Sequence, residues 1–199
     1  MVLSEVGSPT VTEVPIRGLA DHLRLASGFS DDGSQDALLE NYLRAAMSAI
    51  EARLGLALLT KEYVCTLTGW RDDHSQRLPI GPIQSVSKVK LIGTDGAETL
   101  LDPNSWSVMR DARRPRLVGK FGRRLPAIPR DGHVEIQFVA GFSDNWESVP
   151  ADLRQAVYLL AAHYYENSAG SPDAVAAMPF GVLMLTDPYR SMSLGGCGA

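Results

Sequence analysis

The clearest repeat of hydrophobic positions lies at residues 34–54, where apolar side chains return every three or four residues. One stripe consists of Leu39, Leu43, Met47, Ile50 and Leu54, and a second stripe beside it of Leu38, Tyr42, Ala45 and Ala49. Polar residues fall on the opposite side. This spacing predicts an amphipathic helix whose wide apolar face suits packing against two neighbouring elements.

Two further segments have helical periodicity. The shorter one, at 17–26, places Leu19, Leu23 and Ala26 on one side. The longer one, at 150–167, starts at a proline, which fits the first helical position, and is apolar almost all round. We expect a helix with so little polar surface either at the centre of the fold or buried against another subunit.

The hydrophobic period changes to two in the middle of the chain, at about residues 58–140. Val134, Ile136 and Phe138 alternate with Glu135 and Gln137. Such alternation is typical of a strand with one face on a core and one face in water. Thr94-Asp95-Gly96 is a hairpin signal, and several prolines and glycines separate the short apolar runs. These features predict a small antiparallel sheet.

The order of these elements predicts an α+β fold. We expect a helical bundle core, made of the two N-terminal helices and the long C-terminal helix, with an inserted small antiparallel β lobe. A single domain would cover residues 16–192. Residues 1–15 are expected to form a flexible arm and residues 193–199, with the sequence SLGGCGA, a disordered tail.

Composition changes this picture little. Hydrophobic residues make up 45% and charged residues 21% of the 199 positions, which is ordinary globular usage. No apolar run approaches the roughly 18 residues that span a bilayer. Residues 1–15 lack the basic and apolar regions of a signal peptide, so we expect a chain made in the cytoplasm that has no membrane partner.

Candidate catalytic chemistry is sparse. The chain contains none of the common nucleotide-binding, metalloprotease or serine-hydrolase motifs. Asp72-Asp73-His74 places two carboxylates beside a histidine, but adjacent loop residues rarely converge on one ion. Cys65 and Cys197 lie far apart and are expected to be free thiols. We therefore expect no enzyme, no metal site and no cofactor.

The charge is strongly uneven along the chain. Residues 110–130 contain eight basic residues and one acidic residue, a net charge of +7. Because the whole chain carries −4, the remainder carries −11. This basic segment either contacts a nucleic-acid backbone, remains a solvated loop, or docks on the acidic surface of a neighbouring protein. The candidate docking residues are Arg113, Arg114, Arg116, Lys120, Arg123 and Arg124.

A second candidate surface lies near the C-terminus, where large apolar groups are concentrated. Its residues are Phe180, Leu183, Leu185, Pro188, Tyr189 and Arg190. They either fold back onto the helix at 150–167 or dock in a groove on a partner protein. Tyrosine and arginine are frequent hot-spot residues in protein interfaces, which suits the second reading. Both readings can hold in turn.

Several segments, in order along nearly the whole chain, resemble the head–tail connector (adaptor) proteins of long-tailed phages and of related gene transfer agents. They are Leu19–Leu25, Asp31-Asp32, Ala45–Gly55, Leu78–Ile83 with Val86 and Val89, Phe138–Phe142, Val149–Leu153, Ala161–Asn167, Met178–Val182 and Pro188–Arg190. The likeness is closest to the adaptor of a gene transfer agent. The basic segment at 110–130 is not part of the resemblance.

The resemblance implies a structural protein of the virion or gene-transfer-agent particle, at the head–tail junction. It implies a homo-oligomeric ring, a dodecamer, that binds the portal protein and the next tail component, a stopper or tail terminator. DNA would pass through the ring without specific binding. On this reading, the C-terminal residues contact the portal or a neighbouring subunit. The alternative function is a small nucleic-acid-binding module that acts through Arg110–Arg130.

Overall fold

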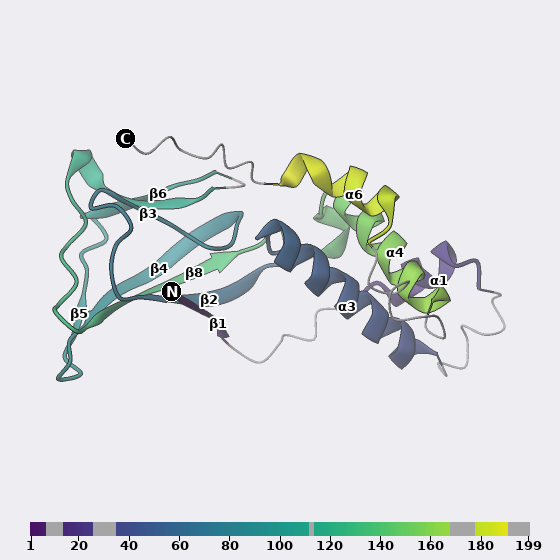
Figure 1. Ribbon diagram of the computed structural model, residues 1–199, viewed down its shortest axis with the longest axis horizontal. Coiled ribbons are helices and arrows are strands. Elements are labelled where there is room, and N and C mark those ends of the chain that lie inside the picture. The colour runs from purple at the N-terminus through teal and green to yellow at the C-terminus, as the bar shows by residue number, and fades with distance from the viewer. Residues whose placement is uncertain (7–13, 26–34, 112–113, 168–177, 191–199) are drawn as a thin grey trace. The chain divides into compact units, whose positions relative to one another are not determined.

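The computed structural model divides the chain into two compact units (Figure 1). The structure describes residues 1–6, 14–25, 35–111, 114–167 and 178–190. One unit contains Met1–Thr10 and Gly55–Phe142 and carries the strands; the other contains Val11–Leu54 and Ser143–Ala199 and carries the four α-helices of the described residues. We describe each unit by itself.

The β unit is built on a five-stranded antiparallel sheet. Its strands, in spatial order, are β1 (Val2–Val6), β2 (Lys61–Leu67), β8 (His133–Ala140), β4 (Ile83–Ile92) and β5 (Glu98–Leu100). The alternation in β8 sets the two faces, because Val134, Ile136 and Phe138 are fully buried while Glu135 and Gln137 are only half-buried.

A second, three-stranded antiparallel sheet belongs to the same unit. It has the order β3 (Ser75–Arg77), β7 (Arg116–Gly119) and β6 (Trp106–Met109), and the short 3-10 turn η1 (Lys120–Gly122) follows β7. Leu117 of β7 and Trp106 of β6 belong to the same hydrophobic cluster as Ile136 and Phe138 of the larger sheet. The two sheets therefore share one core.

The helical unit contains α1 (Ile16–His22), α3 (Asp36–Leu54), α4 (Ala151–Glu166) and α6 (Phe180–Thr186), with the 3-10 turns η2 (Trp146–Ser148) and η3 (Asp187–Tyr189). α4 contacts the three other helices. Leu153, Ala156 and Val157 on α4 are fully buried. Contacts on several sides explain why α4 is apolar almost all round.

The expected fold class, a helical bundle core with a small inserted β lobe, is wrong. The strands form two sheets of five and three strands with a core of their own, so they are not a lobe attached to helices. Long helical stripes are easy to read in a sequence, whereas short strands acquire a core only when segments far apart in the chain pair with one another. The sheet content was underestimated for that reason.

The expected flexible arm at 1–15 also differs from the structure at residues 2–6. These residues form β1, which pairs antiparallel with β2, so that Leu3 lies opposite Cys65 and packs against the core. An edge strand with a distant partner leaves little local signal, because its hydrogen bonds and its core contact both come from elsewhere in the chain. The tail expected at 193–199 lies outside the described residues.

Candidate interaction surfaces

The C-terminal segment folds back onto α4. Figure 1 shows α6 beside α4, and the two helices are in contact. The inward side chains of α6 are Val182 and Thr186, both fully buried, and the Thr186 hydroxyl donates to the Val182 carbonyl oxygen over 2.8 Å. A Cβ added at Gly181 would lie 3.6 Å from Leu159 Cδ1, which is ordinary van der Waals contact.

The end of this segment is attached to α4 by a hydrogen bond. The Tyr189 hydroxyl donates to Asp152 Oδ1 over 2.8 Å. Arg190, the next residue, pairs instead with Asp187 over 3.3 Å, and both of these side chains are more than half exposed. Such exposed pairs contribute little to stability. The structure therefore uses Tyr189 to hold the segment in place and leaves Arg190 on the surface.

The outer side of α6 carries an exposed apolar pair. Phe180 is 75% exposed and Met184 is 59% exposed, and their spacing of four residues places them on one side of the helix. Pro188 is also exposed, whereas Leu183 and Leu185 are half-buried. Sequence analysis missed Met184, although its helical spacing from Phe180 was the available signal. We call Phe180, Met184 and Pro188 the outer stripe.

The described residues of the basic segment are spread over β7, η1 and the loops beside them. Arg116 lies on β7 directly opposite Arg77 of β3. The Arg114 amide donates to Asp111 Oδ1 over 3.1 Å, just before β7. Arg124 pairs with Asp73 over 3.2 Å, with both side chains well exposed. Arg113 lies outside the described residues.

The cross-strand neighbours Arg77 and Arg116 were not foreseen as a pair. Like charges directly opposite one another on a sheet repel, and among the described residues neither guanidinium has an ion pair. The charge of Arg116 also acts on Asp72: hydrogen bonds from the His74 amide and the Ser75 hydroxyl lower the pKa of the Asp72 carboxylate, and Arg116 adds a smaller effect in the same direction.

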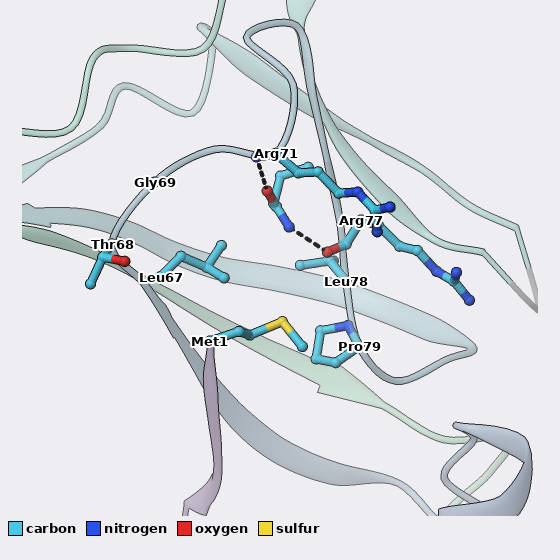
Figure 2. Close-up of a pocket in the computed structure, with 9 residues that line it drawn as sticks. Met1, Leu67, Thr68, Gly69, Arg71, Arg77, Leu78 and Pro79 are labelled. Carbon is cyan, nitrogen blue, oxygen red and sulfur yellow. Dashed lines mark hydrogen bonds between the residues drawn. The ribbon is translucent and has the colours of Figure 1, made fainter. Parts of the chain in front are cut away.

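A cavity of about 460 Å³ opens beside Arg77 in the β unit (Figure 2). Its apolar lining comes from Met1, Leu67, Leu78 and Pro79, and its polar lining includes Arg71, Gln76 and Arg77. The buried Gln76 side chain accepts from the Arg71 amide and donates to the Arg77 carbonyl oxygen, so its polar atoms are satisfied within the protein. None of the described residues that line this cavity is acidic, a histidine or a cysteine.

The other groups that could support chemistry have structural roles. Asp72, beside His74, shapes a turn through the two hydrogen bonds described above. Cys65 is buried in the β-unit core, and this burial raises the pKa of its thiol to about 11. Among the residues that the structure describes, no three acidic, histidine or cysteine side chains are grouped to hold a metal ion.

Within the described ranges, every helix is too short or too polar to cross a membrane.

Comparison with known proteins gives matches among solved structures alone. No protein-family model and no curated protein matches the sequence. The chain is similar to a chain in the neck of an empty GTA particle computed with C6 symmetry, with 44% identity, a TM-score of 0.87, and coverage of 98% of this chain and 99% of the other. GTA denotes a gene transfer agent.

Two further structures match equally broadly. The virion of a native gene transfer agent particle contains a chain with 44% identity and a TM-score of 0.85, and the neck of a native GTA particle computed with C12 symmetry contains one with 41% identity and a TM-score of 0.83. Each match covers 98% of this chain and 99% of the other. Because identity this high extends over nearly the whole of both chains, the protein belongs to the same family as this neck component of gene transfer agent particles.

Proposed function

We propose that the protein is a structural adaptor that forms a ring between the portal and the tail of a gene transfer agent or phage-like particle. The observation that carries this proposal is the 44% identity, over 98% of the chain, to a component of a GTA neck. The neck relative supports a structural role. We therefore propose no enzymatic activity.

The symmetry of the related particles supports an oligomeric ring. The necks that contain the relatives were computed with C6 and with C12 symmetry, and twelve copies of one chain satisfy both. We propose a dodecamer that surrounds and extends the DNA channel. DNA would pass through without specific binding, since a chain with a net charge of −4 has little overall attraction for a polyanion.

We propose that the outer stripe of α6 is the main anchor on a partner. Phe180 and Met184 are large, apolar and more than half exposed, which is unusual for side chains without an external contact. The same contact would include Pro188 and Arg190, which lie at the surface beside them. Leu183, Leu185 and Tyr189 are partly covered, so they would take part only if α6 moves away from α4. The partner would be the portal or a neighbouring subunit, and the next tail component would bind elsewhere on the ring.

The test is a paired substitution in particles. Phe180→Asp combined with Met184→Asp should remove the apolar anchor without disturbing the buried side of α6. We expect incorporation into purified particles to fall at least about tenfold, as for loss of an interface hot spot. Truncation after Met178 is a less clean test, because it would also uncover the surface of α4 that Val182 covers.

A matched control separates the anchor from general surface effects. Leu38 on α3 is an apolar side chain of the same unit, 45% exposed, and Leu38→Asp should leave incorporation unchanged. Imaging of the particles by electron microscopy should show a ring of this chain between portal and tail. Absence of the unsubstituted chain from particles would refute the adaptor proposal.

The alternative, nucleic-acid binding through Arg110–Arg130, draws support from the exposed guanidinium groups of Arg116 and Arg123. It predicts binding of duplex DNA by the purified protein that weakens steeply as salt rises. Replacing Arg113, Arg114, Arg123 and Arg124 by alanine should abolish that binding. If the unsubstituted protein does not bind DNA at low salt, this alternative is excluded.

A further inference from the structure

The turn after β7 presents one aromatic side chain almost entirely to solvent. Phe121 is 92% exposed, more than any other large apolar residue in the described part of the chain. Its backbone is left-handed, with φ 56° and ψ 31°. A bulky side chain in this region of backbone space is uncommon and strained, and such residues cluster at functional sites.

The turn that carries Phe121 is held rigidly from both sides. The Gly119 amide donates to the His74 carbonyl oxygen over 3.1 Å, and the Leu125 amide donates to the Asp73 carbonyl oxygen over 2.7 Å. The Lys120 amide donates to the Ser105 carbonyl oxygen over 3.0 Å. Because these bonds hold the backbone on each side of Phe121, binding through the turn would require little ordering of its main chain.

Glycine is required at the base of this turn. A Cβ at Gly119 would lie 2.0 Å from the Arg123 carbonyl oxygen, which is backbone and cannot move aside easily. Gly122 has a φ of 71°, so two successive residues of the turn are left-handed. The sequence therefore builds a tight knob whose apex is an aromatic ring.

Basic residues lie close to Phe121 in the sequence. Lys120, Arg123 and Arg124 flank Phe121, and Asp73 pairs with Arg124 alone. The Lys120 ammonium donates to the Pro103 carbonyl oxygen over 3.2 Å, and so remains a net positive charge. Among the described residues, none pairs with the exposed Arg123 guanidinium. The chemistry that complements such a knob is an apolar pocket with carboxylates on its rim.

We infer that the turn at residues 119–124 is a docking knob, in which Phe121 enters an apolar pocket rimmed by acidic side chains on a different protein of the particle. A DNA duplex would match the charges but would accept the ring only by unstacking a base step, which costs free energy. The cavity of a second copy is a poor match, because it is lined by Arg71 and Arg77, which would repel the knob. This inference rests on the proposed function, since it requires the chain to be part of a particle.

The experiment places the photo-crosslinking residue p-benzoylphenylalanine at position 121, in cells that also make the unsubstituted chain so that particles form. Purified particles are irradiated, and the crosslinked peptides are identified by mass spectrometry. Leu100, which is 60% exposed on β5 of the same unit, receives the same residue as the control position. We expect position 121, and not position 100, to crosslink to one other particle protein at a site beside Asp or Glu side chains. Arg123→Glu in the same chain should lower that yield roughly tenfold through like-charge repulsion.

The outcomes separate the two proposals. Crosslinks from position 121 to DNA or to another copy of this chain, or no crosslink in particles that contain the substituted chain, would overturn the docking knob alone. Absence of the unsubstituted chain from particles would instead overturn the adaptor role and the knob with it. Phe121→Ala should leave the unfolding temperature of the purified protein unchanged, because the ring makes no buried contact within the chain.

Discussion

The Tyr189 hydroxyl lies 2.8 Å from Asp152 Oδ1, and this hydrogen bond connects the end of the C-terminal segment to the first turn of α4. The two residues are 37 positions apart in the chain. Together with the buried Val182 and Thr186, they hold α6 on α4 while the outer stripe faces away. An anchor held in this way is already folded before any partner arrives, which lowers the entropy lost on docking.

Tyr189→Phe should loosen α6 without unfolding the helical unit. The change removes one hydrogen bond to a carboxylate, and because both groups are only partly buried we expect a loss of about 1 kcal/mol. Hydrogen–deuterium exchange should show faster exchange of the amides in residues 180–186, with little change in α3. Arg190→Ala is the matched control, since its exposed ion pair should contribute little. Equal exchange in Tyr189→Phe and the unsubstituted protein would contradict the role assigned to this contact.

Tyr158→Phe should destabilise the helical unit. The buried Trp146 donates its indole N–H to the Tyr158 hydroxyl over 2.9 Å, so the substitution leaves this donor without an acceptor. We expect the free energy of unfolding to fall by about 1–3 kcal/mol, measured by chemical denaturation. Tyr164→Phe makes the same chemical change on the same helix, where the structure gives the hydroxyl no hydrogen-bond partner among the described residues, and should have a smaller effect. If the two substitutions lowered the free energy of unfolding equally, the hydrogen bond from Trp146 would not be the cause of the loss.

Gly119→Ala should distort the turn that carries Phe121. The added methyl group would meet the Arg123 carbonyl oxygen, so we expect a loss of about 1–3 kcal/mol in the free energy of unfolding. Gly69→Ala is the control in the same unit, because a Cβ there has no heavy atom within 4 Å. Thermal unfolding of the two variants checks this, and a Gly119→Ala protein as stable as the control would contradict the geometry of the turn.

Cys65 should be inert to alkylation in the folded protein. Burial raises the pKa of its thiol to about 11, so almost no reactive thiolate is present near neutral pH. A Cys197→Ser variant isolates Cys65, and iodoacetamide should modify it only in denaturant. Rapid labelling of the native protein would show that the core of the β unit opens readily.

The raised pKa of the Cys65 thiol also makes the free energy of unfolding depend on pH in the alkaline range. The thiol ionises at about 9.0 when unfolded and at about 11 when folded, so between these values the unfolded state loses the proton first. The contribution of Cys65 to stability is therefore complete below about pH 9 and is lost as the pH rises toward 11. Cys65→Ala, also in the Cys197→Ser background, should lack this part of the alkaline decline in the free energy of unfolding.

The sequence predicted a helix or strand well where the hydrophobic period within that one segment was clear. The double stripe at 34–54 corresponds to α3 at Asp36–Leu54, because helical spacing depends on neighbours three and four residues away. The alternation around Ile136 likewise corresponds to β8. For the C-terminal segment, sequence analysis left open whether it folds back or docks. The structure has the folded-back arrangement and leaves its Phe180 side exposed.

By itself, the sequence determined the helical and strand periods, the concentration of positive charge at 110–130 and the scarcity of catalytic motifs. All of these are properties of residues close together in the chain. Only the tertiary structure decided that residues 2–6 are an edge strand, that the strands form two sheets on one core, and that Arg77 lies opposite Arg116. Strand pairing joins residues separated by tens of positions, and its free energy comes from burial that no local window contains. The exposure of Phe121 was hidden for the same reason, since contacts from residues 73–74 and 105 hold its turn in place.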